Sequence, residues 1–155
     1  ILGAVREHVH DPHQLLTSVQ EVLRPGGLIF LSVPNFACDE QKQFGEDWDA
    51  LSFPHHLLHF TPVTLRRLVE AHGLQVQELR INSRASWVRR SYNQVLARDD
   101  VKGLKRLWTK VRRLRPFIQL KSWWSARRKQ GNCLFLIAQR PMSKTVNKPV
   151  RSSAA

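Results

Sequence analysis

Cysteine is scarce in this sequence, which contains only Cys38 and Cys133 among its 155 residues. Two cysteines so far apart provide neither a disulfide framework nor the paired spacing of a metal site, so we expect a reducing compartment. A cytoplasmic protein is the default expectation, with a peripheral position at the inner membrane surface as its variant. The sequence also lacks an apolar run of the ~20 residues that a membrane-spanning helix requires.

Acidic residues are scarce in the second half of the chain. Residues 81–155 contain 19 Lys and Arg residues against 2 Asp and Glu, whereas residues 1–80 contain 6 against 10. Such asymmetry between the halves indicates a surface for an anionic partner.

The basic segment 84–130 is expected to be helical, because Val101, Leu104, Trp108 and Val111 recur at helical spacing. Three interpretations of it stay open. The first is a helical lid whose polar face is solvated. The second is a helix on an anionic membrane surface, since Trp beside Lys and Arg suits the headgroup region. The third, nucleic-acid binding, is the least expected because no recognition motif accompanies the charge.

The most regular pattern lies between residues 11 and 33. Asp11 is a good helix N-cap, and Pro12 suits the first helical position. The apolar residues that follow recur at helical spacing: Leu15, Leu16, Val19, Val22 and Leu23. Pro25 ends this helix. The unbroken apolar run 28–33 then predicts a strand buried on both faces of a parallel sheet.

Polar residues follow the ends of two predicted strands. A first strand would end near Val5, just before Glu7 and His8, and the second ends before Pro34 and Asn35. In open α/β sheets, ligands bind beyond the carboxyl ends of the strands. These residues are therefore expected at the rim of a binding crevice.

Several short motifs occur in a fixed order along the first half of the chain. They are Glu7-His8-Val9-x-Asp11-Pro12, Leu23-x-Pro25-Gly26-Gly27, Val33-Pro34-Asn35, Trp48, Pro54-His55-His56-Leu57, His59-Phe60-Thr61-Pro62 and the segment from Leu65 to Gly73. Taken together, these motifs resemble the second half of a class I S-adenosylmethionine-dependent methyltransferase. Within that family they look most like the subgroup that includes the quinone-biosynthesis O-methyltransferases.

The resemblance implies an α/β fold with a Rossmann-like methyltransferase sheet, of which the chain would hold the carboxyl-terminal half. A strand is expected over 74–81, and a last strand over 133–138 would pair antiparallel with it. The basic helical insert 84–130 would lie before that last strand. The methyltransferase part would cover residues 1–140, followed by a disordered polar tail over 141–155.

Methyl transfer requires a nucleophile aligned with the methyl carbon and often a base, a role that histidine suits near neutral pH. The candidate catalytic residues are His8, His55, His56 and His59. Each has a simpler alternative: His8 could cap or pack, and the other three could bond loop backbone and hold that loop closed. The resemblance places the last three over the pocket.

Substrate contacts are expected from Glu7 and Asn35 at the rim, and from Trp48 in a loop-rich segment over 36–58. Some related methyltransferases bind a divalent metal through a Glu-x-x-Glu-His run. The first Glu of that run would fall on Ala4, which cannot bind a metal ion, so no metal is expected.

The resemblance implies S-adenosylmethionine as the cofactor, with Gly3 and Ala4 contacting it through their backbone. The glycine-rich loop and the acidic residue that complete this site in the family would precede Ile1, so the chain is expected to be an inactive fragment. The complete protein would methylate an O or N atom of a small-molecule, lipid-linked or glycan substrate. The alternative is a non-catalytic, degenerate methyltransferase-like module that binds anionic membrane or nucleic acid through its basic helices.

We predict that the 155-residue chain alone binds S-adenosylmethionine weakly or not at all, because most of the expected cofactor contacts are missing from its sequence. Isothermal titration calorimetry measures this affinity. A dissociation constant in the micromolar range would contradict the prediction.

Overall fold

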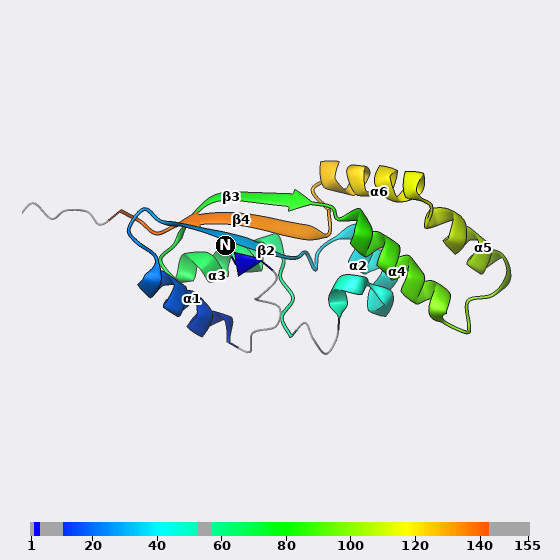
Figure 1. Cartoon of the computed structure of the whole chain (residues 1–155), viewed down its shortest axis with the longest axis horizontal. Coiled ribbons are helices and arrows are strands. Elements are labelled where there is room, and N and C mark those ends of the chain that lie inside the picture. Colours follow the sequence, from blue (N-terminus) through cyan, green and yellow to red (C-terminus); the bar gives the residue numbers. More distant parts are fainter. Residues whose placement is uncertain (1, 4–10, 53–56, 143–155) are drawn as a thin grey trace, which may run out of the picture.

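The computed structural model describes residues 2–3, 11–52 and 57–142. Its centre is a four-stranded sheet in the order β1-β2-β4-β3 (Figure 1). The strands are β1 (Leu2–Gly3), β2 (Leu28–Pro34), β3 (Gln75–Asn82) and β4 (Cys133–Gln139). β1 runs parallel to β2, whereas β4 lies between β2 and β3 and is antiparallel to both. The expected antiparallel pairing of the last strand with the strand over 74–81 is confirmed.

Two helices, α1 (Pro12–Val22) and α3 (Pro62–Ala71), lie on one face of the sheet (Figure 1). Each begins at a capping side chain followed by proline, Asp11-Pro12 in α1 and Thr61-Pro62 in α3, and both pairs stand among the motifs of the sequence. The Asp11 carboxylate accepts hydrogen bonds from two backbone N–H groups of the first turn, at 2.8 and 3.1 Å. Thr61 and Thr64 form a reciprocal capping box. These caps satisfy N–H groups that a helix start otherwise leaves unpaired.

The main hydrophobic core lies between these helices and the sheet. Leu16 of α1, with Leu65 and Val69 of α3, packs against the buried residues of β2 and β4. Every second residue of β2 is buried, beginning with Ile29, whereas Leu28 is 48% exposed. The expectation that this strand is buried on both faces is therefore wrong for the described residues. The physical reason is that α1 and α3 cover only one of its faces.

The basic insert forms a second lobe together with the segment that follows β2. Its helices are α4 (Ala85–Ala97), α5 (Gly103–Arg112) and α6 (Arg115–Arg127), and the segment after β2 forms α2 (Asp39–Phe44) and the short 3-10 turns η1 (Gly45–Asp47) and η2 (Asp49–Leu51). None of the helices in the described ranges is long and apolar enough to cross a membrane.

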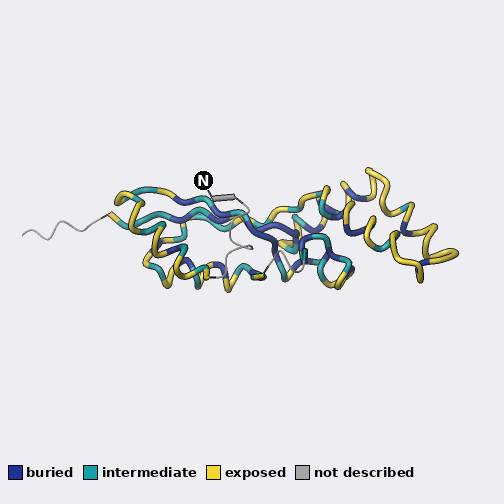
Figure 2. Tube along the Cα trace, turned by 60° about the horizontal axis from the view of Figure 1, so that its bottom comes forward, coloured by how far each residue is buried: buried dark blue, intermediate teal, exposed yellow. Residues whose placement is uncertain are grey.

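A small hydrophobic core of its own holds this second lobe together (Figure 2). Its buried residues come from the α2 region, α4 and α6: Cys38, Phe44, Trp48, Ala50, Val88, Tyr92 and Ile118. The loop-rich segment expected over 36–58 is therefore largely helical between residues 39 and 51. The sequence offered no sign of this, because the apolar partners of this short segment lie about 40 to 80 residues further along the chain.

The chain continues past β4 along the turn between α1 and β2. The backbone N–H of Arg140 donates to the carbonyl of Gly27 at 2.9 Å, and the N–H of Gly26 donates to the carbonyl of Arg140 at 2.9 Å. Of the tail predicted to be disordered, residues 143–155 lie outside the described part of the chain.

Two buried asparagines, Asn35 and Asn132, tie the second lobe to the end of the sheet, and we call them the asparagine clamp. The side-chain amide of Asn132 accepts a bond from the N–H of Arg84 at 2.7 Å and donates to the Arg84 carbonyl at 3.2 Å. The side chain of Asn35 donates to the carbonyl of Gly131 at 2.8 Å. The backbone N–H of Asn35 donates to the carbonyl of Asn132 at 2.9 Å. The clamp thus joins the end of β2, the start of α4 and the start of β4.

Replacing Asn132 by Ala should lower the free energy of unfolding by about 1–3 kcal/mol, because the backbone groups of Arg84 lose their partner at a buried site. Urea denaturation followed by circular dichroism measures the change. The control is Asn93→Ala, which removes an exposed amide bonded to Arg113 and should change stability by less than about 0.5 kcal/mol. Equal effects at the two positions would contradict a special role for the clamp.

Candidate functional site

The predicted crevice lies at the carboxyl ends of β1 and β2. These strands are parallel, with Gly3 opposite Ser32, so their ends lie at the same edge of the sheet. Asn35 follows β2 directly and forms a parallel bridge with Phe60. The segment that contains His59 therefore lies beside the end of β2.

His59 is the one predicted catalytic histidine within the described ranges. Its ring stacks on the ring of Phe36, with centroids 5.0 Å apart and planes inclined by 25°. The structure thus places a half-buried imidazole next to the residue that follows Asn35. This position agrees with a place at the crevice rim, and a catalytic role for His59 stays a prediction.

Asn35 is 1% exposed, and both ends of its amide are engaged. The side-chain nitrogen donates to Gly131, and the side-chain oxygen accepts from the backbone N–H of Ala37 at 3.1 Å. These bonds hold the turn after β2 in place. In the structure Asn35 is thus a positioning residue for the rim, and direct contact with substrate stays a prediction.

Trp48 lies in the core of the second lobe, with 1% of its surface exposed. The centroid of its indole ring lies 6.3 Å from the centroid of the Phe36 phenyl ring. The indole N–H has no hydrogen-bond partner among the described residues. Trp48 therefore packs beneath the rim in this structure, and its role in binding substrate is an untested prediction.

The remaining predicted site residues lie outside the described part of the chain. They are Ala4 of the cofactor pair, Glu7 of the substrate set, and the candidate bases His8, His55 and His56. Gly3 is described only as the second residue of β1. The described residues contain no group of three or more side chains that could hold a metal ion.

The second lobe contains a buried carboxyl group that the sequence did not predict. Glu40 in α2 is fully buried, and neither of its carboxylate oxygens has a hydrogen-bond partner among the described residues. Burial raises the pKa of Glu40, and the positive charge of Lys121 on α6 opposes that rise. Burial likewise lowers the pKa of Lys121, whose ammonium group lies 4.9 Å from the centroid of the Phe44 ring.

Cys38 is the neighbour of this carboxyl group and the N-cap of α2. Its sulfur accepts a hydrogen bond from the N–H of Gln41 at 3.2 Å. Burial raises the pKa of the Cys38 thiol to about 12. Because the thiolate is the reactive form of cysteine, this rise lowers the reactivity of Cys38 near neutral pH.

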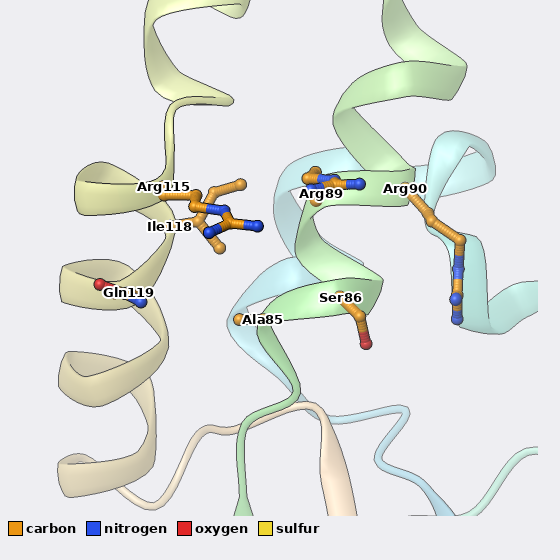
Figure 3. A pocket seen from close by; sticks show the side chains of 7 residues that line it. All are labelled: Ala85, Ser86, Arg89, Arg90, Arg115, Ile118 and Gln119. Carbon is orange, nitrogen blue, oxygen red and sulfur yellow. The ribbon is translucent and has the colours of Figure 1, made fainter.

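A basic pocket of about 420 Å³ lies between α4 and α6 (Figure 3). Arg115 extends from α6 toward α4 and Arg89 lies over α4, whereas Arg90 lies on the side of α4 away from α6, where it pairs with Asp49 at 2.8 Å. Arg89 and Arg115 form no ion pair within the described ranges, and no carboxylate lines the pocket. Two unpaired guanidinium groups can bind an anionic group. The sequence indicated only the excess of positive charge. Which sides of α4 and α6 face each other depends on how the helices pack.

Replacing Glu40 by Gln should stabilise the protein near neutral pH by about 1–3 kcal/mol, because it removes a buried charge that lacks hydrogen bonds. Because the pKa of Glu40 is raised on folding, the native state binds the extra proton. The stability of the native state therefore falls as the pH rises from the usual pKa of a glutamate toward the raised pKa of Glu40. Below the usual pKa of a glutamate, the variant and the wild type should have the same free energy of unfolding.

Urea unfolding at pH values below and above this range measures how the stability depends on pH. The matched control is Glu46→Gln, the same chemical change at an exposed position, which should alter stability by less than about 0.5 kcal/mol. A variant that is less stable than wild type at neutral pH would show that the pair with Lys121 outweighs the cost of burial.

Comparison with known proteins places these features in a family. A family model described as a methyltransferase domain matches residues 2–79. No protein in the curated set matches the chain. Among solved structures, a Bacillus halodurans protein assigned as a methyltransferase is 15% identical, with a TM-score of 0.51 over 90% of this chain and 62% of its own.

Two other solved structures have lower scores. The methyltransferase subunit of a Haloferax volcanii complex with the activator Trm112 is 16% identical, with a TM-score of 0.48 over 90% of this chain and 52% of its own. Geranyl diphosphate C-methyltransferase from Streptomyces coelicolor A3(2) is 15% identical, with a TM-score of 0.42 over 89% and 46%.

The chain thus spans about half the length of the structures that it resembles, 52% and 62% in two of them. Identities of this size bear on the fold alone, and the expected Rossmann-like α/β methyltransferase fold is confirmed. The match over residues 2–79 extends across half of the sequence and contains the strand–helix–strand unit and the turn with His59. The chain belongs to the family of methyltransferase domains.

Proposed function

We propose that the complete protein transfers a methyl group from S-adenosylmethionine to an O or N atom of a small-molecule, lipid-linked or glycan acceptor. The observation that supports this most directly is the position of His59 beside the carboxyl end of β2, in a chain of the methyltransferase family. Of the acceptor classes we favour a lipid-linked or quinone-like molecule, because the motifs resemble the quinone-biosynthesis subgroup. We also propose a cytoplasmic protein with a peripheral position at the inner membrane surface.

The described part of the cofactor edge is compatible with S-adenosylmethionine. Gly3 ends β1 opposite Ser32 of β2, and a glycine leaves the backbone of a strand end open to a close approach. We propose that Gly3 and Ala4 contact the cofactor through their backbone. The cofactor supplies a methyl group bonded to a positively charged sulfur.

The residues of the chain would then orient the acceptor and remove its proton. The acceptor oxygen or nitrogen forms the new bond to the methyl carbon, and the sulfur retains the electron pair of the bond that breaks. The proton of the acceptor passes to a base, for which we propose His59, with His8, His55 and His56 as the other candidates. The stacking of His59 on Phe36 fixes the plane of the imidazole, and the bonds of Asn35 hold the turn beneath it. Glu7 and Trp48 are proposed as further substrate contacts.

A second candidate function is a non-catalytic module that binds an anionic membrane or a nucleic acid. One observation favours it: residues 101–130 contain 11 Lys and Arg residues and no Asp or Glu. Nucleic acid is the weaker of the two partners because no recognition motif accompanies the charge.

The experiment that tests the proposal is transfer of a radiolabelled methyl group by the complete protein to phenolic quinone precursors and lipid-linked acceptors. We expect the His59→Ala variant to lower kcat by roughly 100-fold or more, the usual contribution of a general base. The variant should also remove the acidic limb of the pH–rate profile. The matched control is His13→Ala, which changes an exposed histidine on α1 and should leave kcat unchanged.

Two results would count against this assignment. Retention of full activity in His59→Ala would transfer the role of base to one of the other histidines. A complete protein that binds no S-adenosylmethionine would favour the non-catalytic module.

A further inference from the structure

The helices α5 and α6 are turned with their large apolar side chains outward. In α5, Leu104 and Trp108 are one helical turn apart on the same face and are 74% and 62% exposed. The residue of α5 that packs against the protein is Thr109, which is 9% exposed. A surface helix ordinarily buries its apolar face and exposes its polar one. The arrangement in α5 is the reverse.

The same reversal continues through α6. Two of the three buried residues of α6 are the small polar Ser122 and Ser125. The exposed large apolar residues of α5, α6 and the turn between them are Leu104, Leu107, Trp108, Leu114, Phe117, Leu120, Trp123 and Trp124. We call residues 101–130 the basic arm. Figure 2 shows that most of its surface is exposed.

The charge of the basic arm has one sign. It contains 11 Lys and Arg residues and no Asp or Glu. Aromatic residues lie among these cations, and the guanidinium of Arg127 lies 4.3 Å from the centroid of the Trp123 ring. Tryptophan and leucine flanked by Lys and Arg are typical of helices that lie in the headgroup region of an anionic bilayer.

We propose that the basic arm docks on the surface of an anionic phospholipid bilayer, with the exposed leucines and tryptophans of α5 and α6 inserted between the headgroups. A bilayer satisfies both properties of this surface, because its phosphates attract the cations and its acyl boundary accepts the apolar side chains. A nucleic acid would satisfy the cations and the aromatic rings and leave the leucines without a partner. The arm of a second copy would bring like charges together.

The basic arm lies at the end of the molecule remote from the turn between α1 and β2 (Figure 1). It could therefore contact a flat surface without displacing α1 and α3 from the sheet. The docking does not depend on methyl transfer, so a loss of activity would leave the proposal unaffected.

The first test is flotation of the chain with vesicles of phosphatidylglycerol and phosphatidylcholine, compared with vesicles of phosphatidylcholine alone. We expect binding to the anionic vesicles and little to the neutral ones. Tryptophan fluorescence should shift to shorter wavelength on binding and should be quenched by lipids with brominated acyl chains, since Trp108, Trp123 and Trp124 are exposed. This measurement uses the unaltered chain and does not rely on variants that must fold.

The second test removes the apolar and the charged contributions separately. Leu104→Ser combined with Trp108→Ser should lower the partition coefficient by roughly tenfold or more. The control is Val22→Ser combined with Val63→Ser, two exposed apolar positions outside the arm, which should leave binding unchanged. Neutralising Lys105, Arg112 and Arg113 with Gln should lower binding by roughly 100-fold, whereas Arg66→Gln with Arg67→Gln in α3 should have little effect.

Three results would overturn the proposal. One is failure to bind the anionic vesicles. Another is binding that the serine variants leave intact and that single-stranded RNA competes away without fluorescence quenching, which would identify a nucleic-acid surface. The third is a dimer in sedimentation analysis that Leu104→Ser with Trp108→Ser dissociates, which would identify a second copy as the partner.

Discussion

The asparagine clamp is the interaction on which the arrangement of the two lobes depends. Side-chain amides of Asn35 and Asn132 replace the backbone partners that the chain loses where it leaves the sheet. A buried backbone group without a partner costs more than a single bond gains, so such a junction needs polar side chains of defined length. The crevice rim at Asn35 and the start of the insert at Arg84 are thereby held in one geometry.

The helices that cover the sheet, and the strand β2, were predictable because their signals lie in residues adjacent in the chain. Asp11 followed by Pro12, and Thr61 followed by Pro62, define helix starts through groups adjacent in the chain. The strand over 28–33 was predicted correctly, whereas its burial on both faces was not, because burial depends on which elements cover the sheet. The helix α2 was missed for a related reason: a six-residue helix is stabilised by distant partners, here Val88, Tyr92 and Ile118.

The candidate site was predictable to the same extent. The rule that ligands lie beyond strand ends led to Asn35, and the family resemblance led to the turn with His59. The structure brings the two segments together. The buried carboxyl of Glu40 and the pocket between Arg89 and Arg115 were not foreseen, since both arise where α2, α4 and α6 pack against each other. A single sequence shows the charge and the apolar periodicity of each helix, but not which helix faces pack against each other.

The register of β3 and β4 has a consequence for how such a domain can diversify. Asn82 and Cys133, the residues at either end of the insert, are direct partners across the two strands. Their pairing closes the two ends of the insert, so the 50 residues between them form a cassette whose surface can change while the clamp partners Arg84, Gly131 and Asn132 stay in place. Lengthening a loop with adjacent ends adds little closure entropy. Evolution can therefore change the surface that this cassette presents while the strands that carry the crevice keep their positions.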